Sequence, residues 1–406
     1  MYFITPDGRK VIDASSGLFC VNAGHTREPI VKAIQEAAQG LDYAPPFQYG
    51  HPEQFRLSAQ LALLAPGDLD QVFYANSGSE AVDTALKIAL AYHRARGQGE
   101  RTRFISRERG YHGVGFGGIP VGGMVANRKM FGNMLAGVDH LPATYNREEQ
   151  AFSIGEPKWG AHLADDLERL IALHDASTIA AVIVEPVAGS TGCLPPPKGY
   201  LERLRKITEQ HGILLIFDEV ITGFGRLGHA FAADRYNVVP DMITFAKGVT
   251  NGAVPMSGVV VRRGIYDTHM QGPEHITELF HGYTYSGHPM AVAAGLATLD
   301  IYKSEGLFER CLAIESTFAD AMMSLRDAPH VADIRPVGLM CGIDLYSRDG
   351  QGGVRGYEAI ELMYHQYDIH CRVTMDTVIV APSLIVSEEN ISDIRDRIAA
   401  VLQAIS

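Results

Sequence analysis

Two stretches decide the fold: ILLIFDEV at residues 213–220 and TFAKG at residues 244–248. Residues 213–217 are an unbroken apolar run, which is typical of a strand buried on both faces of a parallel sheet. Asp218 follows where this run ends, and Lys247 follows the shorter run at residues 242–246. Ligands of open α/β sheets bind just outside the carboxyl ends of the strands. The sequence therefore predicts an acid and an amine presented together at one sheet edge.

This pair suits a cofactor held as a Schiff base by the lysine, with the acid supporting a ring nitrogen. It also has an ordinary structural explanation. An Asp after a strand is a common helix N-cap, and a Lys before Gly is often a solvated loop residue. Short motifs carry little weight without context, so the pair alone leaves both explanations open.

Length and composition favour a two-domain protein that acts on small molecules. The chain has 406 residues, which exceeds the range of about 100 to 200 residues for one domain. A hydrophobic content of 46% is ample for a large core. The net charge of −12, with no basic run, disfavours nucleic-acid binding.

The cysteines and histidines predict neither disulfides nor a metal. The five cysteines are odd in number, widely spaced and without a CxxC pair, which fits neither a disulfide scaffold nor a structural zinc site. The sixteen histidines form no HExxH pattern. No apolar stretch reaches the roughly 18 residues that span a bilayer, and the N-terminus lacks a signal-peptide core. We therefore expect a cytoplasmic protein without a metal and without a membrane partner.

Strand-like runs alternate with helical patterns between residues 70 and 263, which is the signature of an α/β fold. After Pro289 the pattern changes to long helices at 291–305 and 307–326, then short strands near 331–345 and 377–381. This change predicts a smaller C-terminal domain. The expected strands of the first part are 71–75, 103–106, 179–184, 213–217, 242–246 and 257–261, and its main expected helices are 81–96 and 198–210.

A second chemical signal is NSGSE at residues 76–80, between an expected strand and an expected helix. Backbone N–H groups at a helix N-terminus form a phosphate cup when Gly78 allows close approach and Ser79 adds a hydroxyl. A plain Ser N-cap, with Glu80 favouring the helix dipole, explains the motif about as well when it is taken alone.

The stretch GVGFGG at 113–118 formally satisfies GxGxxG and so raises the alternative of a dinucleotide fold. The match is weak, because a polar stretch precedes it and no amphipathic helix follows, as that fingerprint requires. A glycine-rich loop beside Tyr111 describes it better. The Tyr111 ring suits stacking over a flat cofactor, although a surface-loop tyrosine remains an alternative.

Together these residues resemble the class III, or omega, aminotransferases, which are fold type I pyridoxal-phosphate enzymes, and most closely the beta-alanine:pyruvate (omega-amino acid:pyruvate) transaminases. The resemblance covers nearly the whole chain in the family's order. The matching phrases are GLFCVNAGH (17–25), LDYAPPFQYGHP (41–52), NSGSEAVDTALKIALAYHR (76–94), RGYHGV (109–114), VIVEPVAGSTG (182–192), FDEVITGFGR (217–226), FAKGVTNGAVPM (245–256) and HGYTYSGHP (281–289).

The resemblance implies a role for each matching position. Lys247 matches the lysine that anchors pyridoxal 5'-phosphate and moves a proton during transfer, which requires an amine of lowered pKa. Asp218 matches the acid paired with the pyridinium nitrogen. Gly78 and Ser79 match the phosphate cup. The remaining matches are Tyr111 as the stacking ring, Val220 on the opposite ring face, and Thr284, which reaches the phosphate from the neighbouring subunit of a homodimer.

Substrate choice is implied by further positions. Arg372 matches the mobile arginine that pairs with a substrate carboxylate, for which a planar guanidinium is suited. Ornithine and gamma-aminobutyrate relatives carry a fixed arginine where this chain has Ile379, and the latter carry another where it has Val114. Both differences disfavour those substrates. Glu185 partners the fixed arginine in such relatives, which leaves its role here open.

Three departures from the family pattern carry expectations of their own. Phe19 stands where the nearest relatives usually carry a pocket Trp, which predicts a wider pocket and a shifted substrate preference. Met375 and Ser383 interrupt the usual phrases near Arg372, which predicts an altered loop there. The chain also begins after the N-terminal arm of these relatives, an arm that often packs against the partner's active site.

The resemblance thus implies a mostly parallel seven-stranded sheet between helices in a large cofactor-binding domain (41–289). A small α+β domain is formed by 1–40 and 290–406. The implied reaction moves an amino group from beta-alanine or a related omega-amino acid or amine to pyruvate, giving alanine, in a homodimer or a dimer of dimers. The alternatives are an aminomutase, a dialkylglycine-type decarboxylase, and a non-catalytic binding protein of the same fold.

Overall fold

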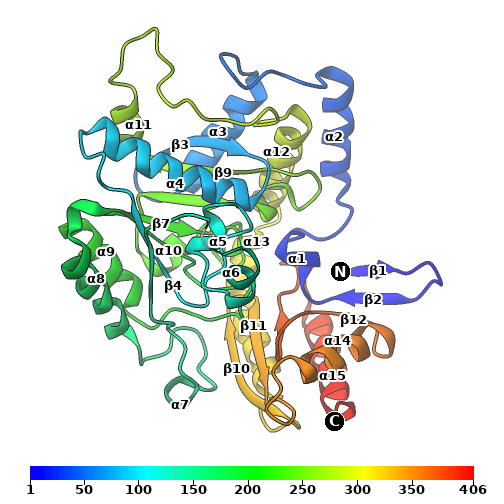
Figure 1. The fold of residues 1–406 in the computed structure, drawn as a ribbon. Helices are drawn as coiled ribbons and strands as arrows, with labels where there is room; N and C mark the ends of the chain where they lie inside the picture. The colour runs from blue at the N-terminus through cyan, green and yellow to red at the C-terminus, as the bar shows by residue number, and fades with distance from the viewer. Residues whose placement is uncertain (133) are drawn as a thin grey trace.

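A computed structural model describes residues 1–132 and 134–406 (Figure 1). Its centre is a seven-stranded sheet in the order β3-β9-β8-β7-β6-β4-β5. The strands are β3 (Leu69–Ala75), β4 (Arg103–Arg107), β5 (Val138–Leu141), β6 (Ile179–Val184), β7 (Leu214–Asp218), β8 (Met242–Phe245) and β9 (Ser257–Arg262). All neighbouring pairs are parallel except those of β9, which runs antiparallel to both β3 and β8. The predicted mostly parallel sheet is confirmed.

The central strands are buried on both faces, as their unbroken apolar runs predict. In β6 every residue is buried. Its side chains alternate, so that Val182 and Val184 pack in one hydrophobic cluster while Ala181 and Ile183 pack in another. Helix α9 (Tyr200–Gln210) contributes to the first cluster and α4 (Gly78–Ala95) to the second.

Further helices and turns complete this part of the chain. They are α3 (Pro52–Leu64), α5 (Gly118–Val121), α6 (Val125–Phe131), α7 (Arg147–Gln150), α8 (Asp166–His174), α10 (Ala232–Tyr236), α11 (Arg263–His269) and the 3₁₀ turns η1 (Ala161–Asp165), η2 (Ala176–Thr178) and η3 (Lys247–Thr250). The glycine-rich stretch 113–118 leads into α5, a helix of four residues. Such a turn is far shorter than the helix of a dinucleotide-binding unit, which removes that alternative.

A second sheet forms after residue 330, in the order β10-β11-β14-β13, with every pair antiparallel. Its strands are β10 (Val331–Val337), β11 (Met340–Leu345), β14 (Thr377–Val380) and β13 (Arg372–Thr374). The helices of this region are α12 (Pro289–Ser304), α13 (Leu307–Met323), α14 (Val354–His365) and α15 (Glu388–Ala404), of which α13 packs on β10 and α14 on β13 and β14. The predicted long helices and short strands of this region are therefore present.

The N-terminal residues join the C-terminal part of the chain in a third, small sheet. Strand β1 (Tyr2–Ile4) pairs with β2 (Lys10–Asp13), and β2 pairs in parallel with β12 (Ile369–His370). Figure 1 shows this N-terminal hairpin beside the orange and red C-terminal elements. Helix α1 (Ser16–Phe19) leads from there toward the large sheet, and α2 (Glu28–Gly40) packs on α12. Within 1–132 and 134–406, no helix has the length and apolar character needed to cross a membrane.

Candidate active site

A cavity of about 180 Å³ lies where β3, β6, β7 and β8 end. This is the edge of an open α/β sheet at which ligands bind. Six of the predicted site residues line it: Gly78, Ser79, Tyr111, Asp218, Val220 and Lys247. The other lining residues are His112, Gly113, Glu185, Ile221 and Ala246.

Asp218 is the last residue of β7, and its carboxylate is held from two sides. Its Oδ2 lies 2.8 Å from Nδ1 of His112. Its Oδ1 accepts hydrogen bonds from the Thr244 hydroxyl at 3.0 Å and from the Val220 backbone N–H at 3.2 Å. Since the side chain is only 5% exposed, these contacts fix the direction in which the acid faces the cavity.

Lys247 opens the 3₁₀ turn η3 directly after β8, with a φ of +52°. Such a φ is uncommon for a residue other than glycine and marks a backbone held by its surroundings. The Lys247 Nζ donates a hydrogen bond to the Leu18 carbonyl at 3.0 Å. Burial lowers the pKa of Lys247, and Arg372 acts in the same direction. A lowered pKa supplies the neutral amine that Schiff-base chemistry requires.

The residues predicted to form a phosphate cup, Gly78 and Ser79, lie at the start of α4. Ser77 is the N-cap, and its hydroxyl accepts the Glu80 backbone N–H, so the ordinary capping explanation holds for that residue. Gly78 and Ser79 line the cavity beyond the cap. A Cβ on Gly78 would lie 3.0 Å from Cγ1 of Val220, so only glycine leaves this corner open.

Tyr111 reaches the cavity from the loop after β4, and Glu185 holds its backbone. The Tyr111 N–H donates to Oε1 of Glu185 at 2.8 Å, and the Gly189 N–H donates to Oε2 at 3.0 Å. Burial, with a further contribution from the Asp218 charge, raises the pKa of Glu185 to about 7. Glu185 therefore changes its protonation state near neutral pH inside the site.

Phe19 and Arg372 lie around the cavity rather than in its lining. The Phe19 ring is buried, and its centroid lies 5.5 Å from Nζ of Lys247. Arg372 begins β13, is half-buried, and lowers the pKa of Lys247 from there. Burial lowers the pKa of Arg372, whereas Tyr111 acts to raise it. Within the described parts of the chain, Arg372 forms no ion pair, and its Nε is buried without a hydrogen-bond partner.

Thr284 is the one predicted site residue that lies apart from the rest. Its side chain is exposed, on the loop before α12, and its carbonyl accepts the Tyr43 hydroxyl at 3.1 Å. Within the one chain of this structure, Thr284 does not line the cavity.

Sequence reasoning missed His112 and Thr244, the two side chains that hold Asp218. Thr244 had a usable signal, since it lies in β8 directly beside Asp218 in the parallel register. His112 follows Tyr111, but nothing in the loop sequence indicates that it turns back to β7. Its Nε2 lies 3.2 Å from the Ser106 hydroxyl, which completes its partners.

The lining residues fit pyridoxal phosphate. The glycine corner at Gly78 admits a phosphate beside the α4 N-terminus, the Asp218 carboxylate suits a protonated ring nitrogen, and Lys247 is an amine of lowered pKa. The fold and the cavity together define the class of pyridoxal-phosphate enzymes built on an open α/β sheet.

Comparison with known proteins gives the family. The Aminotransferase class-III family matches residues 1–402, and the chain belongs to it. The chain is 57% identical over 402 residues to an omega-aminotransferase of Caulobacter vibrioides, covering 99% of this chain and 91% of the relative. It is 47% identical over 408 residues to a beta-alanine–pyruvate aminotransferase of Pseudomonas aeruginosa, covering 100% of this chain and 90% of the relative.

Solved structures agree with the family assignment. A PLP-bound amine transaminase from an uncultivated Pseudomonas species superposes with a TM-score of 0.91 at 34% identity, covering 100% of this chain and 93% of that one. An (S)-enantioselective omega-transaminase from Thermomicrobium roseum gives a TM-score of 0.92 at 34% identity, with coverages of 99% and 90%. The chain is thus an aminotransferase of fold type I, and pyridoxal phosphate is its cofactor.

Proposed function

We propose that this enzyme transfers the amino group of beta-alanine, or of a related omega-amino acid or amine, to pyruvate and so forms alanine. The observation that carries the proposal is Arg372, a half-buried guanidinium without a carboxylate partner among the described residues, near the Lys247 amine. A substrate carboxylate satisfies such a group. Relatives named for omega-amino acids and pyruvate support the same substrates.

Each site residue has a task in that reaction. Bound pyridoxal phosphate supplies an electron-accepting ring that stores the amino group between two half-reactions. Lys247 holds the cofactor and moves the proton at the reacting carbon. Asp218, oriented by His112 and Thr244, keeps a proton on the ring nitrogen. Tyr111 and Val220, which line the cavity, would cover the cofactor ring, while Gly78 and Ser79 would bind its phosphate.

The proposed substrate preference rests on Arg372 and on two positions, Ile379 and Val114, at which other members of the family carry an arginine. Arg372 and Ile379 are cross-strand neighbours in the β13–β14 pair. The fixed arginine of ornithine and gamma-aminobutyrate enzymes would occupy the position of Ile379, and its absence leaves Arg372 as the carboxylate receptor. The Phe19 ring lies 5.5 Å from the Lys247 amine, beside the cavity lining, and is smaller than the tryptophan of relatives, which would leave a wider pocket.

The active enzyme is a homodimer in this proposal, with Thr284 reaching the partner's phosphate site. What supports it is the surface around Thr284. Phe280 is 96% exposed and Tyr285 is 61% exposed on the same loop, with Phe47 at 52% and Tyr49 at 72% on the loop before α3. Large apolar side chains gathered at a surface are typical of an interface.

We also propose that the chain forms two domains, a large one at 41–289 and a small one made of 1–40 and 290–406. The parallel pairing of β2 with β12 and the packing of α2 on α12 support joining the N-terminal residues to the C-terminal part.

The cytoplasmic location that we propose rests on the pattern of five free cysteines.

A substrate panel tests the proposed reaction. The holoenzyme is offered beta-alanine, gamma-aminobutyrate, taurine, ornithine or 1-phenylethylamine with pyruvate, and alanine formation is measured. We expect beta-alanine to exceed ornithine and gamma-aminobutyrate, and the reverse order would contradict the use of Ile379 and Val114. Carbon dioxide release in place of amino transfer would favour a decarboxylase, and an isomeric amino acid as the product would favour an aminomutase.

A further inference from the structure

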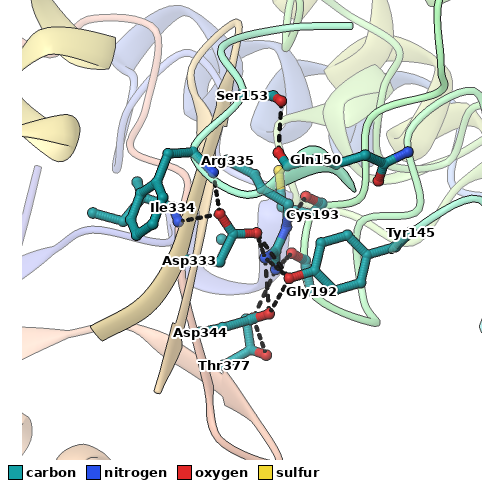
Figure 2. Close-up of polar contacts among 12 residues, drawn as sticks. Tyr145, Gln150, Ser153, Gly192, Cys193, Asp333, Ile334, Arg335, Asp344 and Thr377 are labelled. Atoms are coloured by element: carbon teal, nitrogen blue, oxygen red, sulfur yellow. Dashed lines mark hydrogen bonds and ion pairs between the residues drawn. The ribbon is translucent and has the colours of Figure 1, made fainter. Parts of the chain in front are cut away.

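A buried polar cluster joins the second sheet, β10-β11-β14-β13, to the loops of the seven-stranded sheet (Figure 2). We call it the junction cluster and define it as Tyr145, Asp333, Arg335, Asp344 and Thr377. Asp333 and Arg335 lie on β10, Asp344 on β11 and Thr377 on β14, while Tyr145 comes from the loop after β5.

Arg335 is the centre of the junction cluster. Its side chain is 3% exposed. It donates hydrogen bonds to Asp333 Oδ2 at 2.5 Å, to Asp344 Oδ1 at 2.7 Å, and to the Gly192 carbonyl at 2.9 Å. The Gly192 bond ties β10 to the loop after β6. A Cβ on Gly342 of β11 would collide with the same carbonyl, so this loop lies directly on the sheet.

Tyr145 and Thr377 complete the pairing of the two carboxylates. The Tyr145 hydroxyl lies 2.8 Å from Asp333 Oδ2 and 3.0 Å from Asp344 Oδ2. The Thr377 hydroxyl donates to Asp344 Oδ1 at 2.7 Å. Burial acts to raise the pKa of Asp344, but the charge and hydrogen bonds of Arg335 outweigh it and hold that pKa below its ordinary value. Asp344 is therefore ionised at neutral pH, and every contact is charge-assisted.

The sheet register connects the junction cluster to Arg372. Arg335 lies opposite Gly342, Gly342 opposite Ile379, and Ile379 opposite Arg372. Side chains of directly opposite residues project from the same face of a sheet. Arg335 and Arg372 thus share one row and one face. Thr377, two residues before Ile379, lies on the same face in the neighbouring row, opposite Asp344.

The junction cluster also reaches the loop that carries Tyr111. The Arg109 guanidinium lies 5.3 Å from the Tyr145 ring centroid, and the Arg335 guanidinium lies 4.4 Å from it. Arg109 donates to the Thr191 carbonyl at 3.0 Å, next to the Gly192 carbonyl that accepts Arg335. One set of contacts therefore ties together the Tyr111 loop, the loop after β6 and strands β10, β11 and β14, and β13 pairs with the last of these.

We propose that the junction cluster is a set of positioning residues that fixes Arg372 relative to the cavity and thereby determines affinity for carboxylate substrates. The inference rests on the proposed function, because it uses Arg372 as the carboxylate receptor. Arg372 has no partner of its own among the described residues, so its position depends on the strand that carries it. Misplacement of a binding group by about 1 Å is enough to weaken a bidentate contact.

Thr377→Val tests this role with a change of nearly equal volume. The variant loses the bond to Asp344 and keeps the apolar contacts of β14. We expect KM for beta-alanine to rise about three- to tenfold, while KM for 1-phenylethylamine, which has no carboxylate, stays unchanged in amine half-reactions of the holoenzyme. Tyr145→Phe, which keeps the ring that contacts Arg109 and Arg335, should raise KM for beta-alanine in the same way and leave KM for 1-phenylethylamine unchanged.

Two controls separate positioning from stability. Thr377→Ser keeps the hydroxyl and should restore the KM for beta-alanine. Thr208→Val removes another buried hydroxyl, one on α9 that bonds the Arg205 carbonyl of its own helix, and should shift neither KM. Equal KM shifts for the two amines in Thr377→Val and Tyr145→Phe, or no shift in either, would overturn the inference.

Arg372→Ala distinguishes the failure of this inference from that of the proposed function. If Arg372→Ala raises KM for beta-alanine and Thr377→Val does not, the positioning role alone is overturned. If Arg372→Ala leaves KM for beta-alanine unchanged, Arg372 is not the carboxylate receptor, and both proposals fall.

Discussion

The Nδ1 of His112 lies 2.8 Å from the Oδ2 of Asp218, and both side chains are almost fully buried. His112 comes from the loop after β4 and Asp218 from the end of β7. Because Thr244 occupies the other carboxylate oxygen, the acid is held at both ends. This contact couples the loop that carries Tyr111 to the strand that carries the acid.

Asp218→Asn should abolish most of the activity. A neutral amide keeps the shape of the side chain but no longer favours a proton on the ring nitrogen, so kcat should fall by about 10²- to 10⁴-fold. Single-turnover half-reactions with beta-alanine measure the loss. His112→Phe, which leaves the acid in place but unpaired on one side, should cost only about tenfold.

Asp241→Asn is the matched control for this prediction. Asp241 is a buried aspartate just before β8, paired with Arg205 and with the Leu215 backbone N–H. Its loss should lower the melting temperature without a comparable loss of kcat per folded enzyme. Near-normal turnover in Asp218→Asn would contradict the assigned role of Asp218.

Gly78→Ala should weaken cofactor binding without preventing folding. The added Cβ would lie 3.0 Å from Val220 in the corner assigned to the phosphate, while Ala is otherwise favourable in a helix. We expect the Kd for pyridoxal phosphate, measured by titration of the apoenzyme, to rise about tenfold. Gly264→Ala in α11, where a Cβ meets nothing within 4 Å, should leave that Kd unchanged.

The sequence predicted the acid and the amine because both depend only on where apolar runs end. Asp218 closes β7 and Lys247 follows β8, as expected, although β7 begins and ends one residue later than the apolar run. Strand β5 was not predicted. Its four residues Val138–Leu141 are mostly half-buried at the sheet edge, so they lack the long apolar run of a central strand.

Contacts between distant segments could not be predicted from the sequence. His112 reaches Asp218 across 106 positions of the chain, and only the parallel stacking of β4, β6 and β7 brings their ends together. The junction cluster depends likewise on the register of β10, β11 and β14. Arg335 pairs with Asp333 on its own strand and with Asp344 on β11, and a polar residue in a strand carries no signal of a partner on another strand.

Glu185→Gln should change how stability depends on pH. The pKa of Glu185 in the folded enzyme is raised to about 7 from an ordinary 4.5, so the folded state binds this proton more tightly than the unfolded chain. The contribution of Glu185 to the free energy of unfolding of the wild type is therefore largest below pH 4.5. It falls by about 3 kcal/mol as the pH rises to about 7. Because glutamine does not titrate, Glu185→Gln removes this part of the pH dependence of the free energy of unfolding.

Denaturant unfolding at pH 5 and pH 8 measures the effect. The stability of Glu185→Gln relative to wild type should improve from pH 5 to pH 8, on top of a constant loss of hydrogen bonding to Tyr111 and Gly189. Glu202→Gln, on the exposed face of α9, should show no such trend. A difference that stays constant across this range would show that Glu185 is ionised throughout.

A heterodimer of two single variants, Thr284→Glu and Lys247→Ala, tests whether active sites are shared between subunits. Each variant alone should be inactive, since one lacks the amine and the other places a negative charge at the phosphate. In a heterodimer of the two, one site combines Lys247 of the first subunit with Thr284 of the second. Co-expression with two affinity tags, followed by sequential purification, isolates this species. It should recover about half of the wild-type activity, because one of its two sites is intact. A heterodimer as inactive as its parents, with a normal dimer mass, would place Thr284 outside the partner's site.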